Sequence, residues 1–288
     1  MGDKTRWCPS TIILGPGGVK GFATMGSLLY LEKIGWLENV SSFVGVSVGA
    51  IIAVLLTAGY TVGEIVEHSL SVSLFHDFMS LDISQIKENS GLISNHQVKD
   101  RLEERLVSKF GYLPTLKEFY NFTGITYTAV TLNIDKGEVE YISHLTEPDL
   151  PVVDAVMLSM NIPFVFYKIR YKGCTYVDGA LGNPYPMDYF DDGKTNILGI
   201  YIEHDEHSNS DSIASYFYFI LHSMTGRLKK LAMQKLSPHC KHLIIVTKTT
   251  DTIGLAVSTE TKSELVAQGY EQASAFIGEL REDEARGT

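Results

Sequence analysis

The chain has 288 residues, of which 44% are hydrophobic and 20% are charged, and its formal net charge at pH 7 is −10. This composition is that of a folded globular protein rather than a disordered one. The negative charge disfavours a dedicated nucleic-acid binder and tight adhesion to anionic membranes, because both depend on basic surfaces. The three cysteines show neither CxxC spacing nor a histidine partner pattern, so we expect no disulfide framework and no metal site.

The first ten residues, MGDKTRWCPS, lack the apolar core of a signal peptide. Arg6 stands where an N-myristoylation motif needs Ser or Thr. The longest apolar stretch, Val48 to Tyr60, is shorter than the ~20 residues that a membrane-spanning helix requires, and a buried helix fits it better. We therefore expect a cytoplasmic protein and leave a peripheral association with membranes open.

Six apolar runs bounded by turn residues predict β-strands. They are Thr11–Leu14, Ser42–Val46, Ile125–Leu132, Thr175–Val177, Ile197–Ile202 and Leu243–Thr247. Most are continuously apolar, as expected for parallel strands covered by helices on both faces. Helical patterns separate the runs, and capping-box spacing marks three helix starts. The helical signals are Phe22–Ile34, the pairs Thr61/Glu64, Ser94/Gln97 and Thr115/Glu118, a helix from Pro151 to about Met160, and about Glu260 to Leu280. This alternation predicts a layered α/β fold with a mainly parallel central sheet.

The first of these strands runs into a glycine-rich turn and then a helix, in the sequence TIILGPGGVKG from Thr11 to Gly21. A strand, a glycine loop and a helix start together form a place for negative charge, either a nucleotide phosphate or the transient oxyanion of a carbonyl under attack. The dinucleotide fingerprint GxGxxG fails because Lys20 replaces its last glycine. The GKT that ends at Thr195 fails as a P-loop because Asp188 replaces the first glycine. We therefore expect no bound nucleotide.

The second run ends in GVSVG, residues 45–49, which is the G-x-S-x-G pattern with Ser47 at its centre. An apolar strand precedes it and an apolar helix follows at once, which is the setting of a nucleophile elbow. The helix start also favours developing negative charge on or near the serine oxygen. A glycine- and serine-rich turn that only allows close packing of a strand and a helix remains the alternative.

A nucleophilic serine needs a base, and no downstream histidine stands in a loop that singles it out. The candidates are His144, His204, His207, His222, His239 and His242. A carboxylate is better placed, because the strand Cys174–Val177 runs into Asp178-Gly179-Ala180 and so puts Asp178 at the carboxyl edge of the sheet. A carboxylate near Ser47 could accept its proton directly. An Asp that only forms a turn, and a Ser-His-Asp triad, both stay open.

These motifs occur in the order found in the patatin-like phospholipases, serine lipid acyl hydrolases related to the catalytic domain of cytosolic phospholipase A2, and the chain resembles that family. PGGVKG (Pro16–Gly21) is similar to the family's G-G-G-x-[RK]-G, GVSVG to its elbow, and Asp178-Gly179-Ala180 to its D-G-[GA]. Three softer matches are SMNIPFVF, ALGNPYP and the lid-side segment SGLISNHQVKDRLEERL. The resemblance covers about residues 12–186. It implies a three-layer α/β/α domain over residues 1–281, followed by a charged tail, 282–288, that we expect to be disordered.

The resemblance implies a Ser–Asp dyad, with Ser47 as the nucleophile, Asp178 as its base and an acyl-enzyme as the intermediate. The backbone N–H groups of Gly17, Gly18 and Val19 would form the oxyanion hole. Residues that support these motifs are Lys20, Gly21, Gly45, Gly49 and Gly179. The implied activity is hydrolysis of carboxylic esters in a phospholipid or lysophospholipid, with no cofactor. A catalytically weak or inactive scaffold that binds lipid or protein is the alternative.

One residue departs from the family pattern, because Pro16 stands where the family has the first of three glycines. Proline has no N–H to donate and fixes φ near −65°. We expect an intact oxyanion hole, built from the two following glycines, in a stiffer loop.

The segment from Ser212 to Leu236 is apolar and aromatic at its start, and carries Arg227, Lys229, Lys230 and Lys235 later. As a helix it could lie transiently on a membrane surface, with its basic groups toward the headgroups. A core helix with a solvated basic second half is the interpretation we favour, given the negative total charge.

Overall fold

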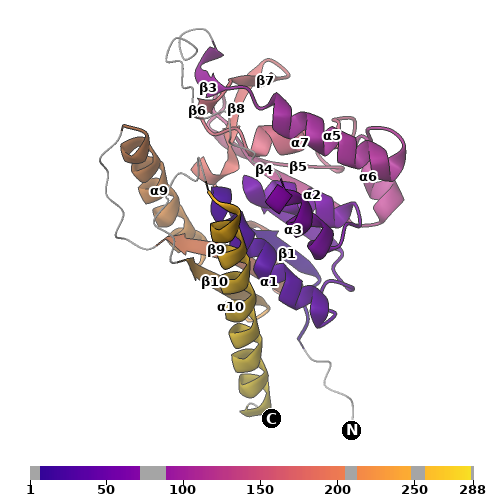
Figure 1. Cartoon of the computed structure of the whole chain (residues 1–288), viewed down its shortest axis with the longest axis vertical. Coiled ribbons are helices and arrows are strands. Elements are labelled where there is room, and N and C mark those ends of the chain that lie inside the picture. The colour runs from indigo at the N-terminus through magenta and orange to yellow at the C-terminus, as the bar shows by residue number, and fades with distance from the viewer. Residues whose placement is uncertain (1–6, 72–88, 205–212, 248–256, 287–288) are drawn as a thin grey trace.

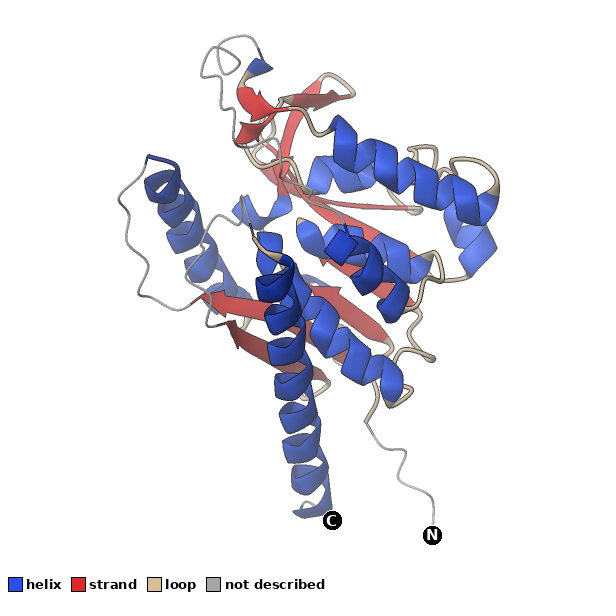
Figure 2. Ribbon diagram, in the orientation of Figure 1, coloured by secondary structure: helices blue, strands red, loops and turns tan. Residues whose placement is uncertain are grey.

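The computed structural model describes residues 7–71, 89–204, 213–247 and 257–286. Its centre is an eight-stranded sheet in the order β10-β9-β1-β2-β4-β8-β7, with β5 paired to β4 as well. Helices lie on both faces of this sheet (Figures 1 and 2). The predicted three-layer α/β/α fold is therefore confirmed. Within the described residues, no helix combines the length and the apolarity needed to cross a lipid bilayer.

The main sheet has a parallel part and an antiparallel part. The parallel strands are β1 (Thr11–Leu14), β2 (Ser42–Val46), β4 (Thr126–Asn133), β9 (Ile197–His204) and β10 (Cys240–Thr247). The antiparallel additions are β5 (Glu138–Ser143), β7 (Ile169–Tyr171) and β8 (Cys174–Asp178). A separate two-stranded sheet pairs β3 (Gly91–Ile93) with β6 (Phe164–Phe166).

The helices between the strands follow the α/β pattern expected from the sequence. The longer ones are α1 (Gly21–Lys33), α2 (Val48–Thr57), α3 (Val62–Ser71), α5 (His96–Phe110), α6 (Leu116–Thr123), α7 (Val152–Ser159), α9 (Ile213–Ala232) and α10 (Thr259–Arg286). Short turns of helix are α8 (Met187–Phe190) and the 3-10 helices η1 (Gly18–Lys20) and η3 (Gly179–Leu181).

The buried side chains of the central strands alternate between two cores. In β1, Ile12 and Leu14 join the larger core, which is shared with α1, α2, α7 and α10, whereas Ile13 joins the smaller core on the other face. Tyr185 and Met187 belong to this smaller core, where Met233, just after α9, also packs. Because both sides of each strand are buried, the strands had to be continuously apolar.

Helices α1 and α10 cross in close contact because glycine stands at both crossing points. A Cβ atom on Gly26 would overlap the carbonyl oxygen of Val266, and one on Gly269 would overlap that of Ala23. The two helices run side by side in Figure 1. This contact fixes α10 against the first helix of the chain, next to the glycine loop from which α1 begins.

Of the three predicted capping boxes, two are confirmed and one is wrong. The capping boxes Thr61/Glu64 and Thr115/Glu118 are confirmed by reciprocal hydrogen bonds. The Ser94/Gln97 box is wrong, because α5 begins at His96 with Asn95 as its N-cap, and the Ser94 hydroxyl accepts from the His96 N–H instead.

The charged tail is also more ordered than its composition suggested. The last helix continues to Arg286, through residues 282–286 that we expected to be disordered. Two contacts hold this end: an i,i+4 ion pair between Arg286 and Glu282, and a hydrogen bond from the Trp7 N–H to Glu284. Residues 287 and 288 lie outside the described part.

Candidate active site

Ser47 occupies a sharp turn between β2 and α2. Its backbone has φ 58° and ψ −126°, a conformation that a residue with a side chain adopts only when its surroundings force it. The flanking glycines allow the turn to be this tight. A Cβ atom on Gly45 would overlap the Ala50 backbone, and one on Gly49 would overlap the Leu14 carbonyl oxygen. The GVSVG sequence therefore folds into a strained elbow packed directly on β1.

Ser47 is almost fully buried, with 6% of its surface exposed. Its carbonyl oxygen accepts the first turn of α2 through the Ala50 N–H at 2.8 Å. Its own N–H points to a different element, donating to the Ser159 Oγ at the end of α7 over 3.2 Å. Both main-chain polar groups of the elbow are thus satisfied inside the protein.

Asp178 lies close to Ser47 because β2 and β8 both pair with β4. β2 pairs with Thr126–Val130 of this strand and β8 with Thr131–Asn133, while β5 covers residues 128–133. Since β5 overlaps both of the other strands in register, β2 and β8 must share the opposite flank of β4 and meet end to end. Val46 lies opposite Val130 and Asp178 opposite Thr131, so the two strands end at consecutive residues.

The direction of the strand that carries Asp178 was not foreseen from the sequence. Asp178 lies beside the carboxyl end of β2, at the predicted edge of the sheet, but its own strand β8 is antiparallel to β4 and approaches Ser47 from the opposite direction. Gly179 makes the close approach possible, because a Cβ atom there would overlap the Val130 carbonyl oxygen.

Burial raises the pKa of Asp178 from 3.8 to about 6, and the nearby Ser47 hydroxyl and a hydrogen bond from the Ala180 N–H oppose this rise. The Ala180 N–H donates to Oδ1 at 2.9 Å. The other oxygen, Oδ2, is buried and has no aligned hydrogen-bond partner among the described residues. The Ser47 hydroxyl is therefore near enough to lower the Asp178 pKa but is not held in a well-aligned hydrogen bond. A buried carboxylate beside a serine hydroxyl is the pair needed for direct proton transfer.

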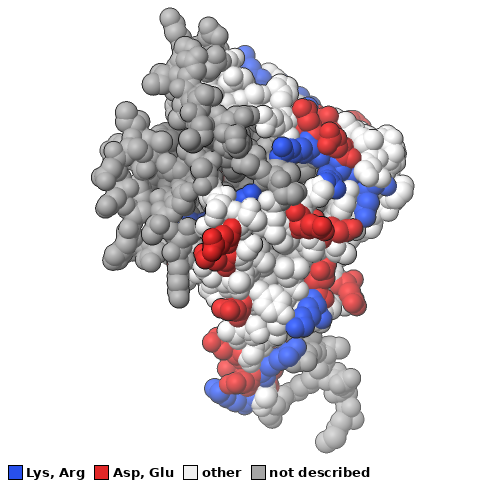
Figure 3. All heavy atoms as spheres, viewed as in Figure 1, with Lys and Arg blue, Asp and Glu red and all other residues white. Residues whose placement is uncertain are grey.

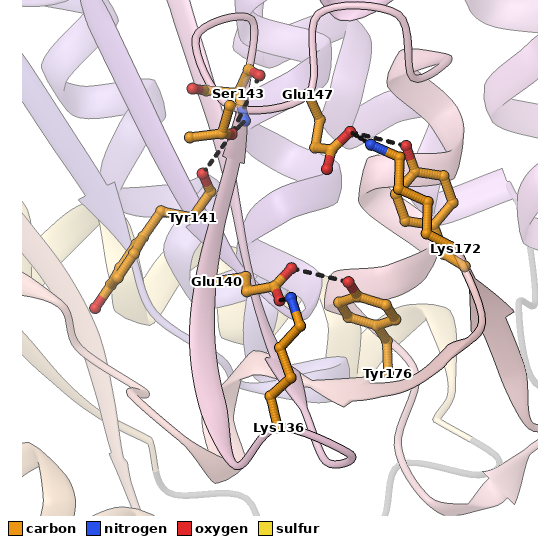
Figure 4. Close-up of polar contacts among 9 residues, drawn as sticks. Lys136, Glu140, Tyr141, Ser143, Glu147, Lys172 and Tyr176 are labelled. Atoms are coloured by element: carbon orange, nitrogen blue, oxygen red, sulfur yellow. Dashed lines mark hydrogen bonds and ion pairs between the residues drawn. The ribbon is translucent and has the colours of Figure 1, made fainter.

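The strand that carries Asp178 is anchored two residues earlier. The Tyr176 hydroxyl donates to Glu140 of β5 at 2.9 Å, and Lys136 donates to the same carboxylate at 3.2 Å (Figure 4). Burial, followed by the bond to Glu140, raises the Tyr176 pKa, so the hydroxyl stays a donor. A second carboxylate in the same view, Glu147, accepts from Lys172 at 2.6 Å, close to the turn that begins β8.

The glycine loop lies directly against the elbow. Gly18 has φ 53°, and the loop then winds into η1, whose Lys20 N–H donates to the Gly17 carbonyl at 2.9 Å. The N–H groups of Gly17, Gly18 and Val19 donate to no other residue within the described part of the chain. Unpaired N–H groups at a helix start are ready donors for an anion.

Two motif-supporting residues hold the loop in place. A Cβ atom on Gly21 would lie 2.9 Å from the Val48 side chain, so the start of α1 packs on the residue that follows Ser47. Lys20 is 3% exposed, so its side chain packs inside the protein and is not a solvated surface lysine. The loop and the elbow therefore form one packed unit.

The candidate histidines whose side chains the structure describes contact other residues. His144 stacks on Tyr120, His239 contacts Asn196 at 2.9 Å, and His242 contacts the Tyr185 hydroxyl at 3.0 Å. The side chains of His204, His207 and His222 lie outside the described part of the structure. Of the candidates in view, Asp178 is the group beside Ser47.

Sequence reasoning did not single out Ser159, Asn161 and Thr131, although the first two belong to the quoted SMNIPFVF match. Each is buried and bonds to the backbone around Ser47 or Asp178. The Thr131 Oγ1 lies 3.0 Å from both the Leu158 and the Val177 carbonyl oxygens. Only their burial around one site distinguishes these three polar residues from others, and burial is not visible in a sequence.

Comparisons with known proteins identify the family and the fold of the chain. The family model described as patatin-like phospholipase matches residues 12–191. A probable lipid hydrolase of Invertebrate iridescent virus 6 is 29% identical over 185 residues, which are 62% of this chain and 62% of that protein. An uncharacterized protein of Acanthamoeba polyphaga mimivirus is 27% identical over 210 residues, covering 69% of this chain and 67% of its own.

Two solved structures share the fold. VipD from Legionella pneumophila aligns with a TM-score of 0.60 at 17% identity, over 94% of this chain and 67% of that chain. The type III effector protein ExoU aligns with a TM-score of 0.55 at 17% identity, over 94% of this chain and 53% of that chain. At this identity the likeness concerns the fold alone.

Proposed function

Because the chain belongs to the patatin-like phospholipase family, whose model matches more than half of it, we propose that it is a lipid acyl hydrolase working through Ser47 and Asp178. The observation that carries the proposal is the end-to-end meeting of β2 and β8 on one flank of β4, which brings the serine and the carboxylate together. The viral relative described as a probable lipid hydrolase supports the same substrate class.

In the proposed reaction, Asp178 accepts the proton of Ser47 as the serine oxygen attacks the ester carbonyl. The N–H groups of Gly17, Gly18 and Val19 stabilise the oxyanion, each donor contributing roughly 2.7–4 kcal/mol to the transition state. The intermediate collapses to an acyl-enzyme, and the departing alcohol takes the proton from Asp178. Water, deprotonated by the same carboxylate, then releases the fatty acid.

The substrate we propose is a phospholipid or a lysophospholipid, with no metal or other cofactor in the reaction. The protein is proposed to act in the cytoplasm and to meet its substrate through transient contact with a membrane surface. The scaffold alternative, which binds lipid or protein without turnover, rests on Pro16 in the glycine loop.

We place the membrane contact on the second half of α9. Met224 and Leu231 are each 54% exposed, and Arg227 and Lys230 are exposed beside them. Residues 224, 227 and 231 share one helix face at i, i+3 and i+7 spacing. Lys229 is not part of this face, since it is buried and paired with Glu203 at 2.6 Å. The basic half of the helix is therefore only partly a solvated surface.

The location of α9 supports this assignment, because α9 packs against η3, the turn that directly follows Asp178. By contrast, acidic and basic side chains are interspersed over the described residues on the face shown in Figure 3. A face that combines basic and apolar side chains beside the site suits an anionic lipid surface.

The test is fatty-acid release from phospholipid vesicles and from lysophospholipid micelles, with a chelator present, by the wild type and by Ser47→Ala and Asp178→Asn. We expect each variant to lose roughly 1,000-fold or more. Ser27→Ala, a buried serine in α1, and Asp188→Asn, an exposed carboxylate, are matched controls that should keep full activity.

Undiminished release by either site variant would overturn the dyad, and loss of wild-type activity with the chelator would overturn the metal-free reaction. A wild type that binds the vesicles but releases no fatty acid from any lipid would establish the scaffold alternative.

A further inference from the structure

The segment Ser159–Asn161, which begins with the last residue of α7, bonds to the backbone of both members of the proposed dyad. We infer that Ser159 and Asn161 are positioning residues, which together fix how Ser47 and Asp178 face each other. This inference rests on the proposed function, and it concerns two residues that touch neither the substrate nor the reacting atoms.

Ser159 holds the nucleophile. It is fully buried, and its Oγ accepts the Ser47 N–H at 3.2 Å. Because β2 ends at Val46, the Ser47 N–H lies just beyond the strand, and the hydroxyl of Ser159 accepts it in place of a strand partner. The Ser47 N–H is thereby committed to Ser159 and does not serve the oxyanion.

Asn161 holds the base. Its carbonyl oxygen accepts the Asp178 N–H at 2.9 Å, and its side-chain Nδ2 donates to the Tyr176 carbonyl at 2.9 Å. These two bonds act as a strand partner for the last residues of β8, where β7, which pairs with Cys174–Tyr176, has already ended. Asn161 is 2% exposed, so water does not compete for these bonds.

The hydrogen bonds of Ser159 and those of Asn161 are coupled, because a single residue, Met160, separates the two in the chain. Thr131 strengthens the coupling, since its Oγ1 contacts the carbonyl oxygens of Leu158 and Val177, the residues before Ser159 and Asp178. A displacement of about 1 Å between reacting groups can cost a hundredfold in rate. One short segment bonded to both partners is therefore a direct means of keeping their separation constant.

The decisive variant is Ser159→Ala, compared with Ser27→Ala, which removes an equally buried hydroxyl from α1. Both should lose similar thermal stability. Only Ser159→Ala should slow the labelling of Ser47 by a fluorophosphonate and lower kcat on a soluble ester, by roughly 10- to 100-fold, with KM within about threefold. Ser159→Thr keeps the acceptor oxygen and should restore most of the labelling rate despite its extra methyl group.

Equal labelling rates in Ser159→Ala and Ser27→Ala, or a Thr variant slower than the Ala variant, would overturn the inference. Should Ser159→Ala not fold, amide hydrogen exchange of Ser47 in the wild type decides instead, because rapid exchange would show that the bond to Ser159 is absent. Failure of the proposed function looks different: the wild type itself would not be labelled, and the inference would fall with it.

Discussion

Ser47 directly follows β2 and Asp178 ends β8, and these strands meet on one flank of β4, where Val46 and Asp178 lie opposite the consecutive residues Val130 and Thr131. The pairing of the strands therefore sets the distance between the proposed nucleophile and the proposed base. This differs from an arrangement in which long loops carry the catalytic groups, because strand pairing leaves little freedom to change their separation.

The first prediction concerns the pH dependence of activity. Asp178 must be ionised to accept a proton, and burial raises its pKa to about 6. We expect kcat/KM on a soluble ester to fall about tenfold for each pH unit below 6 and to be constant above about pH 7. The residual rate of Asp178→Asn should not titrate in this range. A wild-type profile that is flat down to pH 5 would contradict the assignment of the base.

The same carboxylate should lower stability at neutral pH. The Asp178 pKa is about 6 in the folded protein and 3.8 when unperturbed, so the folded state binds the proton more tightly. The contribution of Asp178 to the free energy of unfolding therefore falls by roughly 3 kcal/mol as the pH rises from about 4 to 6, and it stays low above pH 6. Asp178→Asn avoids this cost and should raise Tm at pH 8 but not at pH 4. An equal difference in Tm at both pH values would contradict the prediction.

Packing at the elbow should be intolerant of a single methyl group. In Gly49→Ala the new Cβ would overlap the Leu14 carbonyl oxygen, which belongs to the rigid backbone of β1. We expect a loss of about 3 kcal/mol in urea unfolding, together with loss of fluorophosphonate labelling. Gly278→Ala is the matched control, because this exposed helical glycine has open space around it and alanine there should add about 1 kcal/mol.

Replacing Pro16 tests how the oxyanion is held. Pro16→Gly adds an N–H to the loop, but the proposed hole is already supplied by Gly17, Gly18 and Val19. We expect kcat/KM to change by less than about threefold and stability to fall by about 1 kcal/mol, because glycine gives the unfolded chain more freedom. An increase in kcat of about 100-fold would show instead that the hole lacks a donor.

The exposed face of α9 should bind anionic lipid. We expect Arg227→Gln/Lys230→Gln to weaken sedimentation with phosphatidylserine-containing vesicles about 30-fold, at about 1 kcal/mol for each basic residue. Hydrolysis of a soluble ester should be unchanged. Lys117→Gln/Lys194→Gln removes the same charge from exposed sites before β4 and β9 and should bind like the wild type. Equal binding by both double variants would exclude α9 as the contact.

The amino-acid sequence is enough to predict the strands that are buried on both faces. Thr11–Leu14 and Ser42–Val46 match β1 and β2 residue for residue, because both runs are apolar and end in turns. β5 was missed, since Glu138 and Glu140 interrupt its apolar pattern and only β4 pairs with it. An edge strand with charged side chains is indistinguishable from a loop in a sequence.

The site was predictable in its parts but not in its assembly. Ser47 and Asp178 stand in short local motifs, so the sequence points to them. Their relative direction depends on β8 running antiparallel to β4, and the hydrogen bond from Ser47 to Ser159 joins residues 112 positions apart. Long-range pairing of this kind leaves no local pattern.

Because of the order of the strands in the chain, Ser47 and Asp178 are also synthesised at different times. During synthesis the elbow of Ser47 leaves the ribosome with β1, β2 and α2, whereas β8 follows only after α7 and the hairpin of β4 and β5. A nascent or truncated chain that ends before Asp178 carries the proposed nucleophile without its proposed base. The proposed lipid cleavage thus requires a chain that has been synthesised through β8.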